Sequence, residues 1–360
     1  MNSHPAPQRQ LRGHMPTRPT SRIATTGQHH AQLASRLTLR DRWLARMLYE
    51  HRVFTSHQIT QLCFPTARAT NHRLLDLYTW RFLDRFQPFV SVGTAPMHYV
   101  LDIAGAVALA YEDGLDPKHI GYRHEDAIGI AHSLRLAHTV GINSVFTPLV
   151  ALSRQPGARG RLSAWWSERR CARLFGDIVR PDAYGRWRED GQELEWFLEF
   201  DFGTENLAVL ASKLDDYHHL ATSTGIVTPL LVWLPGNRRE IGARRALSVA
   251  RAQLDRPDLV PVLTTAADVA ATTGDTSAAG ARWLPLGQPT PAASSPRSGS
   301  PASVPPTGRW RLLDIARRWP YQPGTAESAS ANSAPVEGGL GHLAPPAPLP
   351  PAPQPTRFRR

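Results

Sequence analysis

An alternating stretch of eight residues, at positions 194–201, constrains the fold of this chain more than any other feature of its sequence. Side chains two residues apart lie on the same face of a β-strand. One face consists of Leu194, Trp196, Leu198 and Phe200. The other face consists of Phe197, Glu199 and Asp201. The pattern predicts a half-buried strand that carries two carboxylates side by side near its C-terminal end.

The flanking residues place this strand in an α/β core. Residues 178–183 predict a shorter strand in which Asp182 follows a proline. A turn over residues 185–191 would pair the two strands as a hairpin, and Asp182 would then approach Glu199. Further predicted elements are a helix over residues 204–218 and a compact apolar strand over residues 229–234.

The converging carboxylates of Asp182, Glu199 and Asp201 predict a divalent-metal site. Such groups repel one another and are costly to bury unless a cation or a shared proton compensates them. Oxygen ligands suit Mg²⁺ or Mn²⁺, which activate water and stabilise phosphoryl transfer. Lys213, on the following helix, can point its ammonium group at this site. The alternative is that Glu199 and Asp201 are solvated charges of an edge strand, or pair with an arginine such as Arg180.

The N-terminal part of the chain has the pattern of a winged helix. Apolar residues at helical spacing predict helices over residues 39–49 and 66–79. Between them, Thr55 and Gln58 have the spacing of a capping box at the start of a short second helix. The helices are followed by two β-like runs, at residues 82–86 and 97–101. Three short helices and a hairpin predict a winged helix-turn-helix.

The third helix of this module supplies candidates for contact with double-stranded DNA. In a winged helix this element enters the major groove. Its outer face carries Arg68, Asn71, His72 and Arg73. The formal charge of +11 suits a polyanionic partner, because Lys and Arg gain affinity by releasing phosphate counterions. A winged helix that contacts other proteins is the alternative.

Composition separates two folded domains from two tails. The expected divisions are a disordered basic tail at residues 1–35, the winged helix-turn-helix at 36–115, the α/β domain at 124–285 and a disordered Pro-rich tail at 286–360. The α/β domain is expected to open with a helix over residues 124–140. Within the C-terminal tail, residues 309–319 have the pattern of a helix that docks on a partner.

Several observations exclude other classes of protein. Cys63 and Cys171 lack CxxC spacing, which argues against a structural zinc site and a disulfide framework. The most apolar run, at residues 230–234, is too short to span a bilayer. We therefore expect the protein in the cytoplasm, with no membrane partner.

Four short motifs follow the predicted winged helix. They are Pro181-Asp182, Glu199-Phe200-Asp201, Thr204-Glu205 and Lys213-Leu214-Asp215-Asp216-Tyr217. Over about residues 36 to 285, the chain resembles the replication-relaxation family of actinobacterial plasmids and integrative elements. The second domain is also similar to the PD-(D/E)xK, or restriction endonuclease-like, superfamily. Asp201 stands where that motif has its lysine, and Lys213 and Tyr217 lie where RecB-type nucleases carry the Gln and Tyr of a QxxxY motif.

The resemblance implies a DNA-binding protein of plasmid or mobile-element replication, relaxation or transfer, with replication or conjugative-transfer proteins as partners. For the second domain, it implies a Mg²⁺-dependent DNA nuclease or nickase. One alternative is that this domain is inactive and only grips DNA, and another is that the protein is a winged-helix transcription regulator. The candidate catalytic residues are Asp182, Glu199, Asp201, Glu205, Lys213 and Tyr217, the first three also being the metal ligands. A relaxase with Tyr217 as nucleophile fits less well, because the adjacent His218 and His219 on a helix point about 100° apart.

Overall fold

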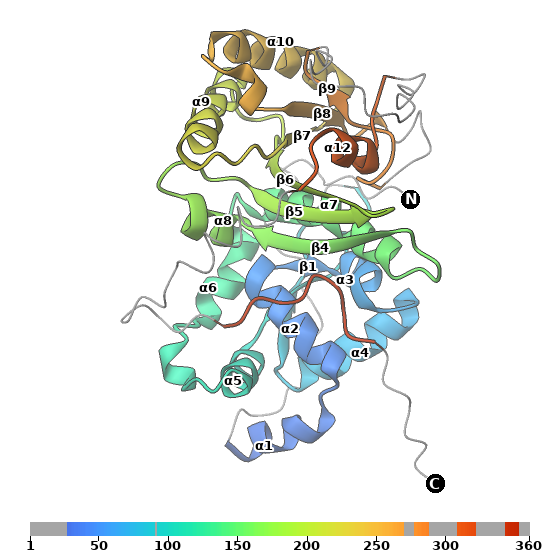
Figure 1. The fold of residues 1–360 in the computed structure, drawn as a ribbon. Helices are drawn as coiled ribbons and strands as arrows, with labels where there is room; N and C mark the ends of the chain where they lie inside the picture. The colour runs from blue at the N-terminus through green and yellow to red at the C-terminus, as the bar shows by residue number, and fades with distance from the viewer. Residues whose placement is uncertain (1–26, 91, 270–276, 288–307, 322–342, 353–360) are drawn as a thin grey trace. The chain divides into compact units, whose positions relative to one another are not determined.

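The computed structural model describes residues 27–90, 92–269, 277–287, 308–321 and 343–352 (Figure 1). Contacts divide the chain into two compact units, and each is a mixture of helices and strands. Unit 1 comprises residues 1–154 and 336–360, and unit 2 comprises residues 155–335. The second domain was expected to begin at residue 124, whereas the contacts divide the chain after Arg154.

Unit 1 contains the three helices and the strands that the sequence predicts. Its helices are α1 (Gly27–Arg36), α2 (Leu39–His51), α3 (Ser56–Cys63), α4 (Ala67–Thr79), α5 (Ile103–Glu112), α6 (His124–Ile128) and α7 (Leu136–Ser153). Its strands β1 (Phe54–Thr55), β2 (Leu83–Phe86) and β3 (His98–Leu101) form an antiparallel sheet in the order β1-β3-β2. The capping box of Thr55 and Gln58 at the start of α3 is confirmed. Thr38 and Asp41 form a second capping box at the start of α2.

Helix α7 belongs to unit 1, where hydrogen bonds join it to the chain around the start of α3. The side chain of Gln58 donates to the Val140 carbonyl at 2.9 Å, and Asn143 Nδ2 donates to the Val53 carbonyl at 2.8 Å. The single helix expected over residues 124–140 is wrong. After α6 and a 3-10 turn over Gly129–His132, the chain leaves helical geometry at Ser133, and α7 begins at Leu136.

Helix α7 is also the one helix of the described residues that is long and apolar enough to cross a membrane. Most of its residues are buried inside unit 1, where it packs against α3. This burial is the pattern of a core helix.

Unit 2 is built on a six-stranded mixed sheet in the order β4-β5-β6-β7-β8-β9. Its strands are β4 (Gly160–Ser167), β5 (Ala183–Glu189), β6 (Gln192–Phe200), β7 (Leu230–Leu234), β8 (Val262–Ala266) and β9 (Leu284–Pro285). Its helices are α8 (Glu168–Phe175), α9 (Leu207–Thr224), α10 (Asn237–Gln253) and α12 (Leu312–Arg318). Strands β6, β7 and β8 are parallel, and α9 and α10 provide the crossovers between them.

Strand β6 is buried on both faces rather than half buried. Phe197 joins the apolar cluster under α9 and α10, while Trp196 and Leu198, on the other face, are equally buried. The hairpin with β5 forms, but its turn is at Asp190 and Gly191. The strand expected at residues 178–183 is wrong, because β5 starts where that prediction ends. Gly185 lies inside β5, where it pairs with Trp165 of β4 and Trp196 of β6, and not in the turn.

The C-terminal region contributes to the core of unit 2, so the expectation of a disordered tail over residues 286–360 is wrong for residues 308–321. Helix α12 packs on β6 and β5 and buries Leu312, Leu313, Ile315 and Ala316. The main chain of Trp310 pairs with that of Trp283. The helix expected at residues 309–319 is therefore present, and it docks on its own chain.

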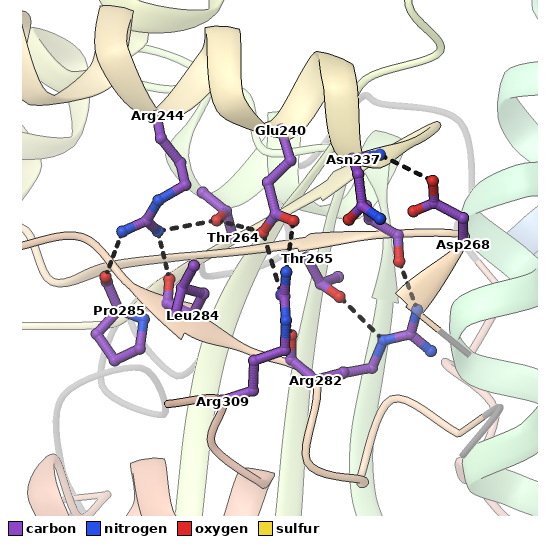
Figure 2. Close-up of polar contacts among 11 residues, drawn as sticks. Asn237, Glu240, Arg244, Thr264, Thr265, Asp268, Arg282, Leu284, Pro285 and Arg309 are labelled. Carbon is purple, nitrogen blue, oxygen red and sulfur yellow. Dashed lines mark hydrogen bonds and ion pairs between the residues drawn. The ribbon is translucent and has the colours of Figure 1, made fainter. Parts of the chain in front are cut away.

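A buried polar network fixes the entry to this segment (Figure 2). Arg309 donates to the Glu240 carboxylate at 2.8 Å, and the Thr264 hydroxyl donates to the same carboxylate at 2.7 Å. Arg282, which is 1% exposed, donates to the Thr265 hydroxyl and to the Ala266 carbonyl. Buried charges persist when paired and hydrogen-bonded in this way. The network joins α10, β8 and the C-terminal segment.

Two further segments fall within the expected tails. Helix α1 overlaps the range 1–35 that was expected to be disordered, so that expectation is wrong for residues 27–35, and the helix buries Leu33. Residues 343–352 lie against unit 1, with Leu343 buried. The remaining parts of both expected tails lie outside the described residues.

Candidate functional site

Glu199 is the centre of a buried polar site at the C-terminal end of β6. Its side chain is 1% exposed. Lys213 Nζ donates to Glu199 Oε2 at 2.5 Å, and the Tyr217 hydroxyl donates to Oε1 at 2.6 Å. The two donors lie four residues apart on α9, so they share one face of that helix. Tyr217 is itself buried.

Asp182 lies at a bend directly before β5. The first residue of that strand, Ala183, pairs with Leu198. The Asp182 N–H donates to the Leu198 carbonyl at 3.1 Å, and Asp182 Oδ2 accepts from the Phe200 N–H at 2.7 Å. The charge of Asp182 acts on both Glu199 and Lys213, so its carboxylate lies close to these two side chains.

The environment of Glu199 alters its protonation. Burial, followed by the nearby charge of Asp182, raises the pKa of Glu199 to about 7, while the hydrogen bonds from Lys213 and Tyr217 oppose the rise. Burial lowers the pKa of Lys213, but the carboxylates of Glu199 and Asp182 outweigh this and raise it above its ordinary value. Burial and the Glu199 charge raise the pKa of Tyr217 well above 10. A tyrosine that keeps its proton in this way does not suit a nucleophile.

Asp201 takes part in a separate ion pair. Arg239 of α10 donates from Nε to Asp201 Oδ2 at 2.6 Å and from Nη2 to Oδ1 at 3.2 Å. Asp201 Oδ1 also accepts from the Gly203 N–H at 2.7 Å. Both carboxylate oxygens are therefore engaged away from Glu199. Among the described residues, no group of three or more His, Cys, Asp or Glu is arranged to hold a metal ion.

Glu205 lies outside the buried site. Its side chain is exposed, and its carbonyl accepts from Arg239 Nη2. Its charge contributes to the raised pKa of Lys213. Of the six predicted catalytic residues, Asp182, Glu199, Lys213 and Tyr217 are brought together, and Asp201 and Glu205 are grouped around Arg239 instead.

Two partners of this site were not predicted from the sequence. Arg239 has no local signal that links it to Asp201, because 38 residues separate them. Glu195 could have been found from the two-residue alternation, since it precedes Phe197 and Glu199 on the same face. Glu195 is buried and accepts from the Tyr184 hydroxyl at 2.7 Å and the Thr228 hydroxyl at 2.9 Å.

The predicted DNA-facing residues of α4 separate into two groups. Arg68, Asn71 and His72 are exposed. Arg73 instead donates to the buried Asp41 of α2 at 2.6 and 3.1 Å, and its guanidinium lies 5.0 Å from the centre of the Trp80 ring. Arg73 therefore holds α4 against α2.

Replacing Tyr217 with Phe is expected to raise the pKa of Glu199 above 7, because the carboxylate loses a donor that stabilises its charged form. A carboxyl whose pKa rises from 4.5 to about 7 on folding retains a proton that the unfolded chain releases. The free energy of unfolding therefore falls as the pH rises through that window, by at most about 1.4 kcal/mol per pH unit. In Tyr217→Phe the fall should extend to higher pH.

The direct measurement is a carboxyl ¹³C NMR titration of Glu199. Tyr184→Phe is the matched control, because it removes the same hydroxyl from Glu195 and leaves the donors to Glu199 in place. Equal Glu199 titrations in the wild type and in Tyr217→Phe would show that the hydrogen bond is absent in solution.

Comparison with known proteins adds one match. A family model described as replication-relaxation matches residues 46–230, which is more than half of the chain. No curated protein and no solved structure matches the chain.

Proposed function

Because the chain belongs to the replication-relaxation family, we propose that it binds double-stranded DNA during the replication, relaxation or transfer of a plasmid or other mobile element, and that unit 2 cleaves a phosphodiester bond. Membership of the family itself suggests a role in replication or relaxation, and so involvement with DNA in general. The proposal places the protein in the cytoplasm, with replication or transfer proteins as partners. The observation that carries the cleavage proposal is the placement of Glu199, Asp182 and Lys213 at one end of β6.

The donor set fits a divalent cation held by two carboxylates. Asp182 and Glu199 would hold Mg²⁺ or Mn²⁺, with Asp201 kept out of the set by Arg239. Mg²⁺ is commonly bound through one or two carboxylates together with substrate phosphates, and it would supply charge neutralisation at the phosphate. Burial is the main cause of the raised pKa of Glu199, and the nearby charge of Asp182 adds to it.

The chain's own residues supply the remaining chemistry. Tyr217 orients the Glu199 carboxylate through one oxygen. Lys213 is bonded to the other oxygen and keeps its side chain 29% exposed, so it can reach a phosphate that approaches from solvent. A fixed ammonium group stabilises the negative charge that develops on a phosphate during cleavage.

A second function is favoured by the same contacts. Both oxygens of Glu199 and both oxygens of Asp201 are already occupied by side-chain donors. A site satisfied in this way suits a domain that grips DNA without cutting it. Incubation of the complete chain with supercoiled DNA and Mg²⁺ separates the two functions: nicking that EDTA stops supports cleavage, and binding without nicking supports the gripping domain.

For unit 1 we propose a winged helix in which α4 contacts DNA. Arg68→Ala is expected to weaken duplex binding several-fold and to reduce the slope of log affinity against log salt by about 1, because one phosphate contact is lost. The measurement is fluorescence anisotropy with a labelled duplex at several salt concentrations. Arg256→Ala is the control, since Arg256 is an exposed arginine of unit 2. An unchanged affinity and slope in Arg68→Ala would assign the exposed face of α4 to other contacts.

A further inference from the structure

The C-terminal segment 343–352 contacts unit 1 through two hydrogen bonds and one buried side chain. Trp43 Nε1 of α2 donates to the Ala347 carbonyl at 2.8 Å, and the Ala344 N–H donates to Asp113 Oδ2 at 2.7 Å. Leu343, where the segment begins, is 4% exposed. In Figure 1 the segment crosses α2 as an irregular chain. It has neither helical nor strand hydrogen bonding of its own.

The receiving surface is preformed by contacts within unit 1. Arg46 donates to both oxygens of Asp113, at 2.6 and 2.9 Å, and so fixes the carboxylate that receives Ala344. Trp43 is 6% exposed, and its indole nitrogen points at the segment. Trp43 and Arg46 lie on α2, Asp113 directly follows α5, and these two helices pack against each other. The carboxylate that receives the segment is therefore held by a residue outside it.

The sequence of the segment matches this surface. Residues 344–352 read Ala-Pro-Pro-Ala-Pro-Leu-Pro-Pro-Ala. Proline fixes φ near −65°, and such runs favour the polyproline II helix, which has three residues per turn. Ala344 and Ala347 lie three residues apart, so they occupy equivalent positions one turn apart along that helix. Aromatic-lined grooves on other proteins bind proline-rich segments in the same extended form.

We propose that the α2–α5 face of unit 1 is a recognition site for a proline-rich segment in the polyproline II form, and that residues 343–352 are its intramolecular ligand. The site recognises three features of the segment: the apolar side chain of Leu343, the backbone N–H of Ala344 and the carbonyl of Ala347, one helical turn later. A proline at position 344 would lack the N–H and could not bond to Asp113. The segment binds this site reversibly, so in the complete chain it competes for the site with a peptide of the same sequence.

The test uses a fluorescent peptide of residues 341–354 and two forms of the protein, the complete chain and a chain that ends after Pro335. The shortened chain should bind the peptide at least about tenfold more tightly, because the tethered segment no longer competes at its high effective concentration. Trp43→Phe in the shortened chain should weaken binding, because the indole donor is lost. Failure of the shortened chain to bind the peptide, or equal binding by both forms, would overturn the proposal.

The peptide carries its own matched control. Ala344→Pro removes the N–H that bonds to Asp113, whereas Ala347→Pro removes an N–H without a partner among the described residues and keeps the carbonyl that accepts from Trp43. The first variant should bind at least about fivefold more weakly and the second as well as the original, because one lost hydrogen bond costs about that factor. Equal affinity of the two variants would contradict the recognition described here.

A second measurement keeps the complete chain intact. In the full-length protein, Ala344→Pro should accelerate hydrogen exchange at the Trp43 indole N–H, as followed by ¹⁵N NMR, and Ala347→Pro should not. Unchanged exchange in Ala344→Pro would also overturn the proposal, even if shortening the chain destabilised unit 1.

Discussion

Replacing Asp182 with Asn should abolish Mg²⁺-dependent nicking of supercoiled DNA, with a loss of roughly 100-fold or more. The substitution removes one of the two carboxylates that would hold the cation and leaves the shape of the side chain. The fold should survive, because an Asn oxygen can still accept from the Phe200 N–H and the backbone bond to Leu198 is unaffected. DNA affinity should stay within about twofold, since the proposed duplex contacts lie in unit 1.

Loss of the Asp182 charge should also be visible without any turnover. Its charge contributes to the raised pKa of Glu199, so Asp182→Asn should bring that pKa down from about 7. Asp177→Asn is the matched control for both measurements, because Asp177 is an exposed acid just before the same strand. Full nicking activity in Asp182→Asn would exclude this carboxylate from catalysis. A wild-type protein that never nicks, while the Glu199 pKa falls as expected, would identify unit 2 as the gripping domain.

The role of Lys213 can be separated from that of the carboxylates. Lys213→Met should lower nicking strongly and should also destabilise unit 2, because it leaves Glu199 buried beside Asp182 without its cation. The Asp182→Asn change should partly offset that destabilisation, since it removes the second negative charge. Thermal melts of the single and double variants measure this coupling.

Ending the chain after Gln288 should remove most of the stability of unit 2. The cut deletes α12, whose Leu312, Leu313 and Ile315 are almost fully buried against the sheet. Burying a large aliphatic side chain contributes about 1.5–3 kcal/mol, and a domain is stable by only about 5–15 kcal/mol in total. The cut also removes Arg309 and leaves the buried Glu240 carboxylate without its cation.

A chain that ends after Gln322 is the matched control for this truncation. Both shortened chains lack residues 343–352, so unit 1 loses the same contacts in each. The longer one keeps α12, Arg309 and the pairing of Trp310 with Trp283. Calorimetry should show the unit 2 transition in the longer chain and its loss, or a midpoint lower by more than about 10 °C, in the shorter one. Coincident transitions would mean that α12 does not pack in solution.

The parts of the fold that depend on local signals were predictable from the sequence. The capping residue Thr55 and the strand β6 depend on patterns within a few neighbouring positions, and the structure contains both, although β6 is buried on both faces. The closeness of Asp182 to Glu199 was also predictable, although Asp182 lies just before β5 and not within a strand over residues 178–183. Gly185 was expected in the turn because glycine favours turns, whereas it lies inside β5, paired with residues of both neighbouring strands.

The remainder depends on contacts between distant positions. The pairing of Arg239 with Asp201 removes one of the three expected metal ligands, and no sequence pattern around either residue predicts this pairing. The same holds for Arg73, which looks like part of a polar helix face until Asp41 of α2 is placed beside it. Composition was the weaker guide at the C-terminus: the segment from Trp310 to Trp319 is amphipathic, but the prolines around it favour disorder.

The packing of α12 on β6 also sets the order in which this protein can mature. Strand β6 carries Glu199, and α12 packs on this strand. The ribosome adds α12 more than a hundred residues after β6. Contacts between residues so far apart in the sequence form slowly, and they cannot form before α12 has left the ribosome. A nascent chain that already contains every strand of the sheet and every residue of the acidic site still lacks the helix that covers this face of β6. Products of premature termination between Pro285 and Arg309 will therefore expose apolar residues of the sheet that α12 normally buries.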